Sequence, residues 1–297
     1  MHLNYVMLGN RGVLTVGGTD RDEFLQGLVS NDIDRVAADR AIWAAYLTPQ
    51  GKYLHDFFIT EIDGVTHLDC ESERLMDLGQ RLHRHKLRAK IDLGLGEGLA
   101  VAALFGGDAL AALDLPAKPG VARALGAGVV YVDPRLAAAG ARAMLPAADA
   151  AALLEARGFV AADPQDYENA RLTLGLSDGS RDLIVGKSTL LESNFEELHG
   201  VDWDKGCYMG QELTARTKYR GLVKKRLLRV RLEGGAPRVG EPVMCDGKEI
   251  GEMRSSLGPR GLAFIRLDRL AAAQESGAAL TAGEARVTPE KPDWANY

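Results

Sequence analysis

The chain has 297 residues, of which 46% are hydrophobic and 26% charged, and its formal net charge at pH 7 is −5. This length favours two domains, and the apolar content is enough for a hydrophobic core without metal or disulfide cross-links. The negative net charge argues against a general nucleic-acid or anionic-membrane binder. No apolar stretch approaches the roughly 20 residues of a transmembrane helix. We therefore expect neither a membrane nor a nucleic acid among the partners.

The three cysteines are Cys70, Cys207 and Cys245. Their odd number and the lack of a CxxC pair argue against a disulfide framework and against an all-cysteine zinc site. The first residues show no basic segment followed by an apolar one, the pattern of a secretory signal. Together these features predict a protein of the reducing cytoplasm, with no metal site of its own.

Short strands and helices alternate through the first part of the chain. Tyr53–Thr60 and Val65–Cys70 flank the turn pair Asp63-Gly64, which predicts a β-hairpin. Other strands are predicted at 12–16, 99–105 and 129–132, and helices at a start near 19–23 and over 74–91, 147–157 and 163–174. We expect a mixed α+β region over 1–220.

The pattern changes near Gly221. Leu228, Val230 and Leu232 alternate with Arg229 and Arg231, as in a strand with one buried face. A second turn pair, Asp246-Gly247, lies between two further strand-like runs. We therefore expect residues 221–297 to form a small all-β domain, a barrel.

The most informative stretch is 201–221, which contains Cys207 two residues after Lys205. Glycines at 206 and 210 allow sharp backbone bends and close approach to a ligand. A turn leading into a helix would direct N–H groups at the sulfur and, with Lys205, stabilise a thiolate. A single cysteine is more often a small buried hydrophobe, but this one lies among glycines and charges. We predict a reactive thiolate at Cys207.

Charge is unevenly distributed around this cysteine. Residues 205–231 hold nine lysines and arginines against one acid, Glu212. A local positive excess in an acidic chain suits an anionic ligand. The alternative, a sheet edge decorated with cations, accounts for Arg229 and Arg231.

The string Lys205-Gly206-Cys207-Tyr208-Met209-Gly210-Gln211-Glu212, continued by Ala215-Arg216 and Arg220-Gly221, resembles the signature of the YgfZ-type folate-binding proteins. Leu191–Asn194 and Lys225–Leu227 are similar to the mitochondrial members that help mature four-iron, four-sulfur proteins. Segments 24–32 and 51–56 resemble the tetrahydrofolate-binding region of aminomethyltransferases. The resemblance implies an α+β, aminomethyltransferase-like folate-binding fold, with two interleaved subdomains over 1–220 and a terminal β-barrel.

The function that this resemblance implies is a tetrahydrofolate-binding accessory factor for the assembly or repair of iron–sulfur proteins, rather than a turnover enzyme. The expected partners are folate and the iron–sulfur assembly machinery or its client enzymes. Cys207 is the expected catalytic residue. A pterin is expected in a central cleft, with cations meeting its glutamate tail. The expected ligand-binding residues are Lys205, Gly206, Tyr208, Gly210, Gln211, Glu212, Arg216, Lys218, Arg220, Asn194, Asp56 and Asn31.

Two other functions stay open. A tetrahydrofolate-dependent one-carbon transferase would use Asp56 as general base. However, this chain reads His55-Asp56 where aminomethyltransferases carry paired acids. It also carries Thr173 where they have a glutamate in R-L-E-A-G. An RNA- or tRNA-binding module would use the basic stretch, against the acidic total.

Overall fold

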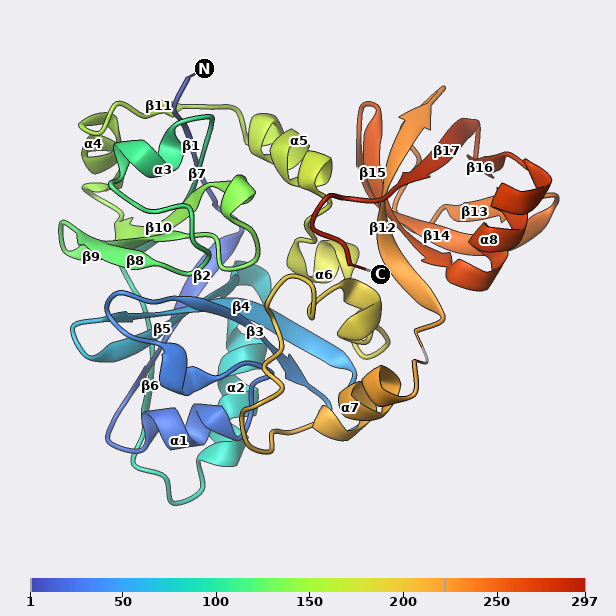
Figure 1. Ribbon diagram of the computed structural model, residues 1–297. Helices are drawn as coiled ribbons and strands as arrows, with labels where there is room; N and C mark the ends of the chain where they lie inside the picture. The colour runs from blue at the N-terminus through green and yellow to red at the C-terminus, as the bar shows by residue number, and fades with distance from the viewer. Residues whose placement is uncertain (1, 222, 297) are drawn as a thin grey trace. The chain divides into compact units, whose positions relative to one another are not determined.

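The computed structural model describes residues 2–221 and 223–296. The chain, shown in Figure 1, forms two units, and each unit is built from segments that are discontinuous in the sequence. Unit 1 comprises Met1–Pro49, Leu54–Tyr167 and Leu198–Met209, and unit 2 comprises Gln50–Tyr53, Glu168–Glu197 and Gly210–Tyr297. The domain boundary expected after residue 220 remains a prediction, and its ranges include residues 1, 222 and 297, which lie outside the described ones.

The first sheet of unit 1 contains the predicted hairpin. Its strands run in the order β3-β4-β5-β2-β6. The turn pair Asp63-Gly64 joins β4 to β5 as expected, and both residues have positive φ, 50° and 75°, which suits aspartate and glycine. The strands are β2 (Arg11–Gly17), β3 (Ile42–Leu47), β4 (Tyr53–Ile62), β5 (Val65–Glu71) and β6 (Asp92–Leu95).

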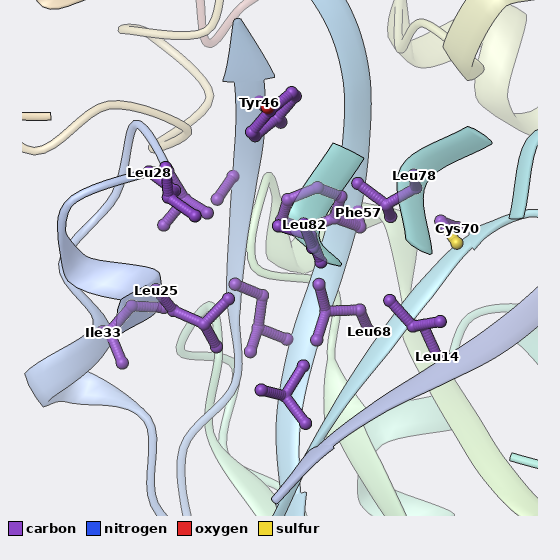
Figure 2. Packing of buried hydrophobic residues seen from close by; sticks show 14 of the residues in the cluster. Leu14, Leu25, Leu28, Ile33, Tyr46, Phe57, Leu68, Cys70, Leu78 and Leu82 are labelled. Atoms are coloured by element: carbon purple, nitrogen blue, oxygen red, sulfur yellow. The ribbon is translucent and has the colours of Figure 1, made fainter. Parts of the chain in front are cut away.

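Helices α1 (Arg21–Gln26) and α2 (Leu75–Lys86) supply the other half of this core. Their buried leucines pack with Phe57 and Leu68 of the sheet (Figure 2). The helix predicted over 74–91 is too long, because Leu87 adopts φ 42° and ends α2 at Lys86. Short 3₁₀ turns, η1 (Ile33–Arg35) and η2 (Ser72–Arg74), complete this layer.

The second sheet of unit 1 has six strands in the order β11-β1-β7-β10-β9-β8. The strands predicted at 99–105 and 129–132 are confirmed as β7 and β9. The helix predicted over 147–157 is shorter, α4 (Ala150–Glu155). The elements are β1 (Asn4–Met7), β7 (Leu99–Phe105), α3 (Ala109–Ala112), β8 (Ala122–Leu125), β9 (Gly128–Val132), η3 (Ala137–Ala139), β10 (Ala141–Pro146) and β11 (Val160–Ala161).

A buried ionic cluster joins the two sheets of unit 1. Asp69 on β5 accepts hydrogen bonds from Arg11 Nε at 2.6 Å and from Arg142 Nη2, on β10, at 2.7 Å. The guanidinium of Arg142 also lies 4.0 Å from the ring centroid of Phe58. Although burial opposes its charge, Asp69 and neighbouring groups raise the pKa of Arg142. Removing one member would leave a buried charge without its partner and lower the free energy of unfolding by about 3–5 kcal/mol.

Unit 2 contains a second buried ionic cluster around Arg171. Arg171 donates to Asp182 at 2.7 Å, to Glu168 at 2.6 Å and to Ser255 Oγ at 2.9 Å. These contacts tie the helix predicted at 163–174 to a barrel strand. The elements before the barrel are α5 (Pro164–Leu174), α6 (Gly179–Asp182), η4 (Leu191–Ser193) and α7 (Gln211–Tyr219).

The last strands close into a barrel in the order β12-β15-β14-β13-β16-β17, as expected (Figure 1). Leu228, Val230 and Leu232 are buried in it, while Arg229 and Arg231 are more exposed. The all-β prediction for this region is incomplete, because α8 (Leu267–Ser276) lies between two strands. The strands are β12 (Lys225–Glu233), β13 (Pro242–Cys245), β14 (Lys248–Leu257), β15 (Arg260–Arg266), β16 (Leu280–Ala282) and β17 (Ala285–Glu290).

Candidate functional site

The segment Leu198–Met209, called here the motif segment, lies along the loop that follows α1. The hydroxyl of Ser30 donates to the carbonyl of Gly200 at 2.6 Å, and the amide of Asn31 donates to that of His199 at 2.7 Å. At the other end, the N–H of Met209 donates to the carbonyl of Gly27 at 3.0 Å. These hydrogen bonds join two stretches that lie about 170 positions apart in the sequence, and they fix the conformation of the motif segment.

Lys205 is the strongest anchor of the motif segment. Its ammonium donates to the carbonyls of Val29 at 2.6 Å and Asn31 at 2.7 Å, and lies 5.2 Å from the ring centroid of Tyr208. Burial lowers the pKa of Lys205 to about 8, although nearby carboxylates oppose this shift. Lys205 therefore positions the loop that carries Cys207. Its expected part in stabilising a thiolate stays a prediction.

Cys207 is exposed in this anchored segment, whereas Cys70 is buried and Cys245 half-buried. Gly206 has no positive φ, and a Cβ added there would meet nothing within 4 Å. Its backbone therefore gives no steric reason for a glycine. The position instead leaves open space beside the cysteine.

Gly210 is the N-cap of α7 and has the left-handed φ of 81°, so here the bend expected from the sequence requires a glycine. Gly51, at φ 73°, packs against this helix start. A Cβ on Gly51 would come within 2.7 Å of the carbonyl of Gly210 and of Leu213 Cβ. The resemblance at segment 51–56 thus includes a glycine that the packing of unit 2 demands.

Helix α7 and the residue after it carry the cations expected to meet a ligand's carboxylates. Arg216 pairs with Glu212 at 2.9 Å, and both side chains are exposed. Lys218 pairs with Glu196 at 2.5 Å. Arg220 is exposed, and no carboxylate in the described part of the chain pairs with it. Of these three cations, Arg220 is best placed to meet an incoming carboxylate.

The positive excess expected over 205–231 is smaller in the folded chain. Arg226 pairs with Glu197 at 2.7 Å and Arg229 with Glu290 at 3.3 Å. Both acids come from outside the stretch. Arg231 pairs with Glu233 at 2.6 Å. The cations of β12 thus serve ion pairs of unit 2.

Asn194 joins η4 to the first barrel strand. Its amide donates to the carbonyl of Leu227 at 2.7 Å, and its oxygen accepts from Arg226 at 3.0 Å. Asn194 is 1% exposed and has φ 62°. The structure therefore brings the two resembling segments, 191–194 and 225–227, into contact. This contact gives Asn194 a structural task, and its expected ligand binding stays a prediction.

Two further expected residues, Asp56 and Asn31, are buried in unit 1, whereas Gln211 is the half-buried first residue of α7 in unit 2. Asp56 accepts from the indole N–H of Trp43 at 3.0 Å. Asn31 donates its second amide hydrogen to the carbonyl of Trp43 at 2.8 Å, so both its N–H groups serve backbone. Burial lowers the pKa of the neighbouring His55 to about 4, and the imidazole lies 2.9 Å from Asp77. His55 is therefore neutral at pH 7.

Several organising residues were missed from the sequence. Asp202 caps the turn of the motif segment, because its carboxylate accepts from the N–H groups of Asp204 and Lys205 at 2.8 and 2.9 Å. An aspartate two or three residues before a bend is a local signal that could have identified it. Trp43 lies far from the motif segment in sequence, and Glu196 precedes that segment by two residues without a local pattern that marks its pairing with Lys218.

Among residues 2–221 and 223–296, no three His, Cys, Asp or Glu side chains lie close enough together to hold a metal ion. No helix in those ranges is long and apolar enough to cross a membrane.

Comparison with known sequences adds further findings. A family model described as the CAF17 C-terminal beta-barrel domain matches residues 224–297. The mouse mitochondrial iron–sulfur cluster assembly factor IBA57 is 33% identical over 97% of this chain and 84% of its own length. The human protein is 31% identical with the same coverages. The homologue from Mycosarcoma maydis is 35% identical over 74% of this chain, which spans 55% of that longer protein.

Comparison with solved structures gives the fold. The glycine cleavage system aminomethyltransferase T from Bartonella henselae superposes with a TM-score of 0.78, covering 99% of this chain and 86% of that one, at 15% identity. The expected aminomethyltransferase-like fold with a terminal barrel is confirmed. At this identity the likeness concerns the fold and not the activity.

One expectation is corrected by these relatives. The cytoplasmic location expected from the sequence is contradicted, because the relatives named above are mitochondrial proteins. The cysteine pattern was the basis of that assignment. It indicates how reducing a compartment is, and does not identify which reducing compartment it is.

Proposed function

The chain belongs to the family of the IBA57 iron–sulfur cluster assembly factors, and from this membership we propose that it assists the assembly or repair of iron–sulfur proteins through the thiol of Cys207. The observation that carries the proposal is the exposed Cys207 on a segment whose neighbours are anchored. An anchored backbone presents the sulfur at a fixed position, which lowers the entropy cost of engaging a partner.

We propose that Cys207 contributes one thiolate to a cluster in transfer. A four-iron cluster takes four cysteine thiolates. Of the three cysteines, all within the described ranges, Cys207 alone is exposed. The remaining ligands therefore come from the client or from an assembly partner, and the cluster is cargo rather than a resident group.

Tetrahydrofolate is the ligand that we propose for this family member. The support is the resemblance to folate-binding proteins and the aminomethyltransferase-like fold. Arg220 fits such a ligand best, because an exposed guanidinium without a carboxylate partner can receive the glutamate tail. Asn31 and Asn194 fit it less well, since their amide hydrogens are given to backbone carbonyls.

Complementation tests the role of Cys207. In cells lacking the gene, the chain should restore the activities of four-iron, four-sulfur enzymes, and Cys207→Ser should restore little or none of them. Cys245→Ser is the matched control, because it removes a half-buried barrel thiol and should rescue fully. Equal cellular levels and unfolding temperatures of the two variants separate loss of chemistry from loss of folding. Full rescue by Cys207→Ser would exclude the thiol from the mechanism.

A further inference from the structure

A small pocket of about 210 Å³ opens in unit 1, beside the loop between η1 and β3. Its lining includes three cations, Arg35, Arg40 and Lys118, together with His199 of the motif segment. Ile42 and two prolines form an apolar wall. Asn31, one of the expected folate ligands, also lines the pocket, but both its amide N–H groups serve backbone carbonyls. The pocket does not include Cys207, and no role proposed above uses its cations.

Two of the three cations have no counter-charge among residues 2–221 and 223–296. Arg35 pairs with Asp202 at 2.5 Å and lies 3.5 Å from Asp32. Arg40 and Lys118, by contrast, pair with no carboxylate within the described ranges. The Nε of Arg40 is buried and has no hydrogen-bond partner there. The charge of Arg40 is therefore balanced neither by a carboxylate nor, at Nε, by a hydrogen bond within the described ranges.

The backbone beneath these cations is tightly fixed. The N–H of Ala41 donates to the carbonyl of Gly120 at 2.7 Å. Gly120 has φ 80°, and a Cβ there would lie 2.5 Å from the carbonyl of Ala41. The segments carrying Arg40 and Lys118 are therefore held in close contact. Across the pocket, His199 adopts φ 60°, and its carbonyl accepts from Asn31.

We propose that this pocket binds a small phosphate monoester. Such a group carries a charge of about −1.5 to −2 at pH 7 and three acceptor oxygens, which matches the two cations, Arg40 and Lys118, that have no carboxylate partner in the described ranges. The apolar wall suits the organic part of the ester. Burial lowers the pKa of His199, so its neutral ring is available for a hydrogen bond.

The pocket volume limits the size of the ligand. A cavity of about 150 Å³ accommodates benzene, so 210 Å³ holds a phosphate with a body of that order. Sites for drug-sized ligands measure about 300–1,000 Å³. The pocket is therefore too small for a whole folate or nucleotide, and the proposal is independent of the folate proposed above.

Calorimetric titration of the full chain tests this proposal, with phenyl phosphate as probe and inorganic phosphate and glutarate for comparison. Phenyl phosphate should bind at one site and more tightly than the other two, because only it satisfies both the cations and the apolar wall. Arg40→Gln and Lys118→Gln should each weaken binding about tenfold. Arg88→Gln, which removes an exposed cation outside the pocket, should leave binding unchanged.

Three outcomes would overturn the proposal. One is no saturable binding of phenyl phosphate. Another is tighter binding of glutarate, which would indicate a dicarboxylate site. The third is an equal loss in Arg88→Gln, which would indicate general electrostatic attraction. Lys118 is exposed, so its substitution keeps the test valid even where Arg40→Gln fails to fold.

Discussion

The core of the first sheet and the motif segment both combine a cysteine with a basic group, and they use burial in opposite ways. In the core, Cys70 is 1% exposed, and burial raises the pKa of its thiol to about 12. His55 is likewise buried, with its pKa lowered to about 4. In the motif segment, Lys205 is the group that is largely buried, and Cys207 remains exposed.

This difference shows which residue can do chemistry. Burial without a strong partner disfavours the charged form of a group, so Cys70 and His55 are uncharged near neutral pH. In the motif segment the cost of burial falls on Lys205, whose ammonium is compensated by two backbone carbonyls. The side chain of Cys207 is exposed. The motif segment therefore combines Lys205, which anchors the loop, with Cys207, which is exposed.

The largest expected effect is in cysteine reactivity. At pH 8, iodoacetamide should alkylate the exposed Cys207 orders of magnitude faster than Cys70, because burial shields Cys70 and raises its pKa to about 12, which leaves only about one thiol in 10,000 ionised. Mass spectrometry of peptides over a time course measures both rates in one sample. The difference should disappear in denaturant, and equal rates in the folded chain would contradict the comparison.

The next effect concerns the anchor. Lys205→Met should lower the free energy of unfolding by about 1–3 kcal/mol at pH 7, because two carbonyls lose their charged donor. Denaturant titration measures the loss. Lys224→Met is the matched control, since this lysine is exposed and should change stability by less than about 0.5 kcal/mol.

The unsubstituted chain and Lys205→Met together also test the pKa of Lys205. The folded value is about 8 against an ordinary 10.5, so between these pH values the unfolded chain binds more protons than the folded one. Stability relative to Lys205→Met should therefore rise from pH 7 to pH 10. A difference that stays constant or falls over this interval would show that burial does not lower this pKa.

The smallest effect is expected at Arg220, the exposed cation that follows α7. Arg220→Gln should weaken binding of a polyglutamylated tetrahydrofolate about two- to fivefold, because exposed ion pairs contribute little. Arg216→Gln should weaken it less, since Glu212 already pairs with that guanidinium. Fluorescence titration gives both affinities. A larger loss in Arg216→Gln would place the glutamate tail elsewhere on α7.

Local sequence signals predicted much of the fold. Alternation at Leu228, Val230 and Leu232 and the turn pairs at 63–64 and 246–247 predicted strands and hairpins that the structure contains. The errors lie where a local pattern was extended beyond the residues that form the element, or where a short pattern was passed over. The helix after residue 74 ends early because Leu87 adopts a positive φ. Helix α8 was overlooked although its alanine run, 271–273, is a helical signal.

The candidate site shows the limit of sequence reasoning more clearly. The sequence alone determined the motif around Cys207, since a signature of adjacent residues needs no folded context. Only the tertiary structure decided what those residues do, because carbonyls near position 30 receive Lys205 and acids at 196, 197 and 290 neutralise cations of the basic stretch. Coulomb and hydrogen-bond energies depend on distance in space, and spacing along the chain does not encode that distance for partners so far apart.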